Sequence, residues 1–155
     1  MRAGVRLAVD VGTVRIGVAR SDATGALAVP LDAVRAGASS VEDVAALVRE
    51  WEAIEVIVGL PLSMSGAEGT AAAAARGWAA TLAERIEVPV RLVDERLSTV
   101  QAQRALQAGG RSTRQSRSLI DSASAVMVLQ ADLDREAAQG TMSDADPRSG
   151  EGTSA

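Results

Sequence analysis

The chain has 155 residues, a net charge of −4 and 47% hydrophobic side chains, so its length and composition are those of one globular domain. It contains no cysteine and no histidine, which excludes disulfides, thiolate catalysis and the metal sites that those residues build. Chemistry in this chain must therefore use carboxylates, hydroxyls, arginines or a bound hard cation.

The N-terminal residues lead directly into the apolar run Val5–Val11, without the longer apolar core of a signal peptide. No stretch approaches the ~20 apolar residues that cross a bilayer. We therefore expect a cytoplasmic protein that does not associate with membranes.

The spacing of apolar residues and of turn residues predicts the elements in chain order. They are strands at 5–11, 15–20 and 26–34, a helix at 41–51, a strand at 54–60, an alanine-rich helix from about 70 to 85, a strand at 89–94, a short helix ending at 109–110, and a long helix from about 112 to 138. The first two strands are expected to form a hairpin around the turn Gly12-Thr13.

Three strands in succession, followed by strands that alternate with helices, predict an α/β fold with a mixed five-stranded sheet. Its first part is a three-strand antiparallel meander, its remaining strands are parallel, and helices flank both faces. The ends of the first, fourth and fifth strands are expected to meet at one edge. From residue 139 the chain is polar and has few apolar side chains, so residues 1–138 are the expected domain and 139–155 a disordered tail.

Acidic residues occupy positions near the ends of two predicted strands. Asp10 lies within an apolar strand, where a carboxylate is costly to bury unless it is paired or binds a cation; capping of the turn that follows is the alternative. Asp94 and Glu95 end the fifth strand, and since successive side chains point to opposite faces, only one of them can join Asp10. The local pattern leaves that choice open, and two solvated acids are the plain alternative.

A third acid, Asp121, lies within the long helix. It shares a stripe with Arg114 and Arg117, while the main apolar stripe, which includes Val126 and Met127, is expected on the far side. A surface acid paired with Arg117 one turn earlier is the alternative interpretation.

Three carboxylates in a chain without histidine suit hard divalent cations, which take oxygen ligands. Two such ions, about 4 Å apart, activate water and stabilise the leaving oxygen of a phosphodiester without a protein general base. A polyanionic partner is also indicated by residues 96–120, which contain five arginines and no acid. We therefore predict Mg²⁺, or Mn²⁺ in its place, as cofactor and nucleic acid as partner; a solvated basic helix face is the alternative.

Four blocks of the sequence together resemble the YqgF family, over about residues 4–138. The blocks are Asp10-Val11-Gly12-Thr13 with Arg15-Ile16-Gly17-Val18-Ala19, Gly59-Leu60-Pro61-Leu62 with Gly66, Asp94-Glu95-Arg96-Leu97-Ser98-Thr99, and Asp121-Ser122-Ala123-Ser124-Ala125. The family is described as Holliday-junction-resolvase-like and as nucleases that mature small-subunit ribosomal RNA precursors. The resemblance implies a ribonuclease-H-like fold and a cytoplasmic nuclease.

The resemblance also implies which residues form the site. It selects Glu95 over Asp94 and makes Asp10, Glu95 and Asp121 both the catalytic triad and the metal ligands. It points to Arg15 and Arg96 as substrate contacts. The predicted substrate-binding set is completed by Thr13, Arg114 and Arg117.

We therefore predict a two-metal phosphodiester hydrolase that processes the 5′ end of pre-16S ribosomal RNA in ribosome biogenesis, as a monomer or weak homodimer. A Holliday junction resolvase acting on branched DNA is one alternative, and it would need a symmetric dimer with two sites. A non-catalytic nucleic-acid-binding assembly factor is another, because fold alone does not guarantee activity. The Asp10–Thr13 turn also resembles the phosphate loop of the sugar-kinase, actin and heat-shock ATPase group, but those proteins close two such domains around ATP.

Overall fold

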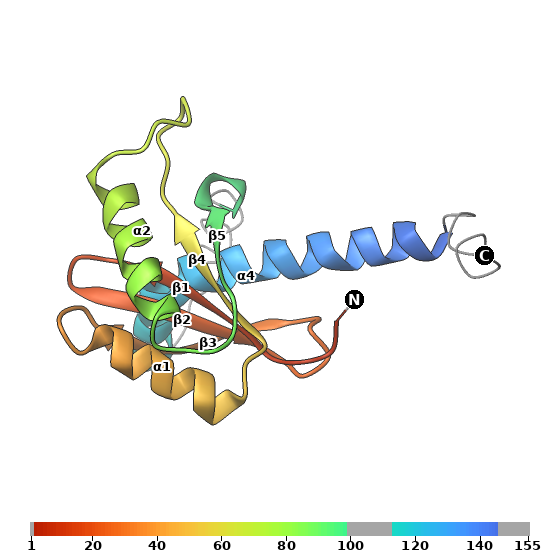
Figure 1. Ribbon diagram of the computed structural model, residues 1–155, viewed down its shortest axis with the longest axis horizontal. Coiled ribbons are helices and arrows are strands. Elements are labelled where there is room, and N and C mark those ends of the chain that lie inside the picture. Colours follow the sequence, from red (N-terminus) through yellow and green to blue (C-terminus); the bar gives the residue numbers. More distant parts are fainter. Residues whose placement is uncertain (1, 99–112, 146–155) are drawn as a thin grey trace.

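The computed structural model describes residues 2–98 and 113–145, and for 97–98, 113–120 and 140–145 the description covers the backbone alone. The elements of these ranges are shown in Figure 1. They are β1 (Arg6–Val11), β2 (Arg15–Ser21), β3 (Ala28–Arg35), α1 (Ser40–Trp51), β4 (Glu55–Leu60), α2 (Thr70–Ala83), β5 (Val90–Asp94), the 3₁₀ turn η1 (Glu95–Ser98) and α4 (Thr113–Ala145).

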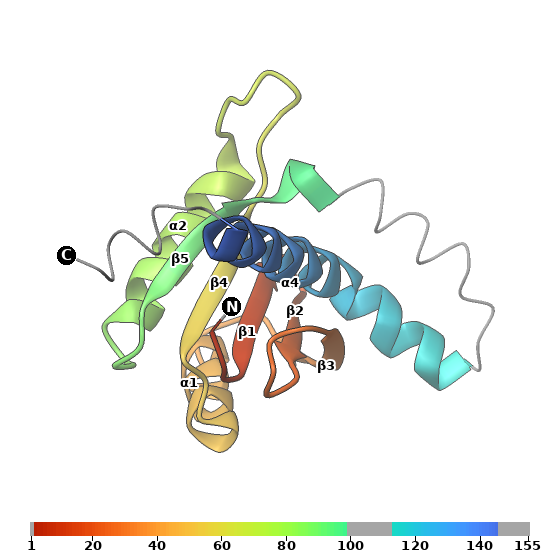
Figure 2. The same cartoon turned by 90° about the vertical axis from the view of Figure 1, so that its right-hand side faces the viewer.

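The strands form one sheet in the order β3-β2-β1-β4-β5. β1, β2 and β3 are antiparallel neighbours, whereas β4 and β5 run parallel to β1. Figure 2 shows α4 running across one face of this sheet, with α1 and α2 on the other. The predicted meander, the parallel strands and the helices on both faces are confirmed.

The side chains of β1 alternate between two buried clusters, one on each face of the sheet. Leu7 and Val9 pack with α1 and α2, whereas Ala8 packs with α4 and with Ala19 of β2. The alternation continues to the end of the strand, so Asp10 belongs to the face that α4 covers. Small side chains on this face let the helix lie close to the sheet.

The helix α4 departs from the sequence-based expectation in its end and in its buried face. It continues past Ala138 to Ala145. Ala125 and Leu129 are its fully buried apolar residues, while Val126 and Met127, expected to form the main apolar stripe, are only partly buried. The prediction was therefore wrong for Val126 and Met127, because the face of α4 that meets the sheet carries Val128, Leu129 and Leu133 together with Ala125.

Two other predictions lie outside the described residues. The short helix ending at 109–110 falls in the range 99–112, and the remainder of the expected tail falls in 146–155. Both stay predictions. No helix of the described ranges is long and apolar enough to span a membrane.

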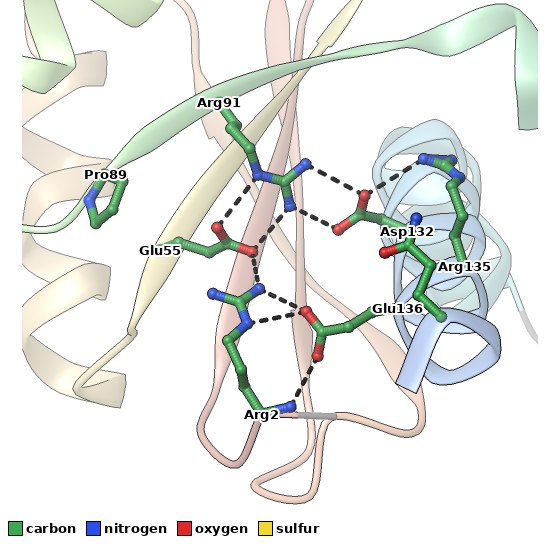
Figure 3. Close-up of a pocket in the computed structure, with 8 residues that line it drawn as sticks. Arg2, Glu55, Pro89, Arg91, Asp132, Arg135 and Glu136 are labelled. Carbon is green, nitrogen blue, oxygen red and sulfur yellow. Dashed lines mark hydrogen bonds and ion pairs between the residues drawn. The ribbon is translucent and has the colours of Figure 1, made fainter. Parts of the chain in front are cut away.

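Ion pairs join the N-terminal segment to β4, β5 and α4 at the end of the sheet where β1 and β4 begin (Figure 3). Arg2 reaches Glu55 at 2.8 Å and Glu136 at 2.6 Å, and Arg91 reaches Glu55 at 3.0 Å and Asp132 at 2.8 Å. These five residues, which we call the ionic clasp, line a cavity of about 480 Å³. The clasp ties four distant parts of the chain together.

Arg6 lies behind the ionic clasp and is 1% exposed. Its guanidinium donates to the Glu136 carboxylate and, at 2.9 Å, to the Gly4 carbonyl. A buried arginine that loses its carboxylate is strongly destabilising, because the charge has already been taken out of water. Glu136 therefore stabilises the folded protein by pairing with Arg6 as well as by its place in the ionic clasp.

We expect Glu136→Gln to lower the free energy of unfolding by about 2 kcal/mol, below the range for a fully buried pair because the Glu136 side chain is 20% exposed. Urea denaturation measures the change. The matched control is Glu68→Gln, which breaks an exposed pair with Arg76 and should barely move the midpoint. Equal effects of the two substitutions would contradict the assigned role of Arg6.

Candidate functional site

The end of β1 and the end of β5 bring two acidic side chains together on the α4 face of the sheet. Arg91 and Val93 of β5 face α4, since Arg91 binds an aspartate of that helix and Val93 belongs to its buried cluster. Glu95 continues this alternation and forms a side-chain hydrogen bond with Asp10. Asp94, one position earlier, does not share this face. The alternation of side chains along β5 therefore places Glu95, and not Asp94, on the face of Asp10, a choice that the local sequence leaves open.

Glu95 is half-buried between the sheet and α4. Its carboxyl carbon lies 3.7 Å from the place where a Cβ on Gly59 would be, and Val128 of α4 lies equally near that place. Burial, then the hydrogen bond with Asp10, then the negative charge of Asp10 raise the pKa of Glu95 to about 8. Two carboxyl groups this close resist carrying two negative charges, so at neutral pH the pair holds a proton.

Asp121 reaches the same region from α4. Its carbonyl oxygen lies 2.4 Å from the position that a Cβ on Gly17 would take, so no larger residue fits there without a shift. Gly17 is the cross-strand partner of Asp10 in the β1–β2 ladder. The Asp121 carboxylate lies 3.8 Å from Nε of Arg15, an arginine that is more than half exposed.

Arg96, predicted to contact substrate, is engaged by the protein itself. Its guanidinium binds the Asp94 carboxylate, with Nη2 to Oδ2 at 2.7 Å and Nε to both oxygens at 3.1 Å. Nη1 donates to the carbonyls of Ser63 and Met64 at 3.4 and 3.3 Å. Arg96 therefore ties the turn that carries Glu95 to the loop after β4, and its side-chain hydrogen bonds to the Asp94 carboxylate lower the pKa of Asp94.

The other predicted substrate contacts fall into two groups. Thr13 and Arg15 are exposed in and beside the β1–β2 turn, at the edge where Asp10 lies. Arg114 and Arg117 belong to the first turns of α4, and their side chains lie outside the described part of the structure. The contribution of these two arginines stays a prediction.

The donor set at this edge fits a hard divalent cation in chemistry. Asp10 and Glu95 offer carboxylate oxygens, the ligands such ions take, and a cation would replace the proton that the pair holds. Within the described ranges, no group of three acidic side chains is gathered closely enough to hold a metal ion. Asp10 and Glu95 are thus a two-carboxylate set, with Asp121 next to it and paired with Arg15.

Sequence reasoning missed the importance of Gly17, which has no reactive group but sets how close α4 lies to the sheet. A signal was present, because a glycine inside an apolar strand indicates close approach of another backbone. The role of Ser122, next to Asp121, was missed as well. Its buried position depends on which face of α4 meets the sheet, and the sequence pattern indicated a different face.

Comparison with known proteins shows strong sequence similarity over most of the chain. The profile of a family described as "RuvX: Holliday junction resolvase" matches residues 4–135. A protein of Thermobifida fusca is 56% identical over 144 residues, covering 88% of this chain and 91% of its own. One from Streptomyces coelicolor is 50% identical over 143 residues, covering 90% and 86%. Both carry the name "Putative pre-16S rRNA nuclease".

Similarity to solved structures is weaker. Thermus thermophilus RuvC in complex with a Holliday junction substrate aligns with 85% of this chain and 94% of its own, with a TM-score of 0.49 and 16% identity.

The raised pKa of Glu95 predicts a pH dependence of stability in metal-free protein. The folded state keeps a proton that the unfolded state releases, so unfolding becomes easier as the pH rises from about 4.5 to about 8. We expect Glu95→Gln to remove this part of the pH dependence, with a larger advantage over wild type at pH 8 than at pH 5. Thermal unfolding in chelator measures it, and parallel curves for the two proteins would refute the prediction.

Proposed function

This chain belongs to the RuvX family, and from that premise we propose that it is a divalent-metal-dependent nuclease that hydrolyses phosphodiester bonds in precursors of small-subunit ribosomal RNA. The observation that carries the proposal is the convergence of Asp10 and Glu95, from segments far apart in the chain, into one hydrogen-bonded pair. The cost of holding two carboxyl groups together is explained if the pair binds a cation.

In the proposed site, Asp10 and Glu95 would hold the metal, and Asp121, now paired with Arg15, would join them once Arg15 binds the substrate. Bound divalent cations supply activation of the attacking water and neutralise the charge that develops on the phosphodiester. Arg15 is exposed and next to Asp121, a placement that suits a contact to a substrate phosphate. Asp94 and Arg96 keep the Glu95 turn in place.

The choice of RNA as substrate follows the names of the relatives, which are about half identical to this chain over most of its length. Branched DNA is the second candidate, because the family that matches residues 4–135 is described as a Holliday junction resolvase. Junction resolution would require two copies of the site in a symmetric dimer, whereas trimming of an RNA end requires one.

We expect Asp10→Asn and Glu95→Gln each to reduce metal-dependent cleavage by at least about 100-fold, because each removes a negative ligand while keeping the side-chain size. The matched control is Asp43→Asn, an exposed acid in the first turn of α1 on the other face of the sheet, which should leave the rate unchanged. The assay uses single-stranded RNA, a ribosomal precursor fragment and a four-way DNA junction, with Mg²⁺, Mn²⁺ or chelator.

The substrate that is cut distinguishes RNA maturation from junction resolution. Unchanged cleavage by both active-site variants would refute the assignment of Asp10 and Glu95. Binding of all three substrates without cleavage by the wild type would favour a non-catalytic assembly factor.

A further inference from the structure

β2 and β3 lose their regular register at a bulge beside Gly17. The pairs Ile16–Val34 and Val18–Leu31 flank the bulge, so Gly17 faces two residues of β3 instead of one. Bulges of this kind interrupt the ladder and often lie next to active sites. Here the bulge is opposite Asp10, the partner of Gly17 on the other neighbouring strand.

A side chain of α4 enters the hydrogen bonding of the sheet at this bulge. The Ser122 hydroxyl accepts a hydrogen bond from the backbone N–H of Val18 at 3.2 Å and donates to the carbonyl of Leu31 at 2.9 Å. Val18 and Leu31 are cross-strand partners, so the hydroxyl bridges the two strands. Ser122 is fully buried, and its hydrogen bond from Val18 is shielded from water, whereas the bond to Leu31 is partly buried.

The same turn of the helix carries Asp121. With Ser122 held by two strands and the Asp121 carbonyl against Gly17, this turn has little freedom to slide along or rotate above the sheet. The position of Asp121 relative to Asp10 therefore depends on the Ser122 bridge, whereas the Asp121 side chain itself is 27% exposed and pairs with the exposed Arg15.

We propose that Ser122 is a positioning residue of the acidic site, which acts through Asp121 by bridging Val18 and Leu31. The proposal rests on the proposed function in so far as it is tested by metal binding and by kinetics. Its structural readout does not depend on that function, so failure of one can be told from failure of the other.

A second buried serine provides a matched control. Ser21 lies at the opposite end of β2 and is also fully buried. Its hydroxyl accepts from the backbone N–H of Arg6 at 2.9 Å and donates to the Asp22 carbonyl at 2.8 Å. Ser21→Ala and Ser122→Ala thus each leave one backbone donor and one acceptor without the hydroxyl, but only Ser122 adjoins the acidic site.

Both substitutions should lower the melting temperature by about 5 °C, because each leaves a buried backbone N–H without its partner. Amide hydrogen exchange should become faster at Val18 in Ser122→Ala and at Arg6 in Ser21→Ala. These two measurements establish that the substitutions are comparable. If Ser122→Ala does not fold, Ser122→Cys takes its place, since a thiol is only slightly larger than the hydroxyl and weakens both bonds.

Ser122→Ala and Ser21→Ala should then differ in metal binding and in catalysis. For Ser122→Ala we expect about tenfold weaker Mn²⁺ binding in a titration and a kcat about tenfold lower, with KM unchanged within about twofold. Ser21→Ala should keep the wild-type values of all three. In a crystal structure of Ser122→Ala, the backbone of Asp121 should lie farther from Asp10 than in the wild type.

Three results would overturn the proposal. One is wild-type Mn²⁺ affinity and kcat in Ser122→Ala despite faster exchange at Val18. Another is the same functional loss in Ser21→Ala, which would trace the effect to stability alone. The third is an unchanged separation of Asp121 and Asp10 in the crystal structure of Ser122→Ala. A wild-type protein that neither binds Mn²⁺ nor cleaves would instead contradict the proposed function.

Discussion

The close contact between α4 and the first two strands is the constraint on which the geometry of the acidic site depends. It is possible only because the strands present small residues at the point of contact: Gly17 meets the backbone of Asp121, and Ala8 and Ala19 lie in the same buried layer. A helix held farther away would leave Asp121 remote from Asp10. A Cβ on Gly17 would collide with the Asp121 carbonyl, which links one glycine directly to the placement of a reactive group.

Polar interactions hold α4 at both ends of this contact. Ser122 joins the helix to β2 and β3, and the ionic clasp joins Asp132 and Glu136 to β4, β5 and the N-terminal segment. Apolar packing is non-directional and tolerates small slides of one element over another. Directional bonds select one position of the helix, and that position is the one that aligns Asp121 with the sheet edge.

The pairing of Asp10 with Glu95 runs against the stability of the metal-free protein. A half-buried carboxyl beside another carboxyl would be more stable in water, as the raised pKa of Glu95 shows. The cost is tolerated because the surrounding strands and α4 dictate where both side chains lie. Such a pair is poised to exchange a proton for a cation, which is the property that the proposed nuclease would use.

The sequence alone determined most of the secondary structure, the kind of chemistry and the family of this protein. The alternation of apolar residues and the spacing of turns predicted the strands, the meander and the helices, because these patterns act over a few residues. The absence of histidine and cysteine confined the chemistry to carboxylates, and the motifs around Asp10, Glu95 and Asp121 indicated the family.

Tertiary structure decided what depends on distant contacts: that Glu95 rather than Asp94 shares a face with Asp10, that Arg96 binds Asp94, and that the Ser122 hydroxyl bridges β2 and β3. The physical reason is that register, helix rotation and the bulge are set by packing between segments far apart in the chain, which no local pattern records.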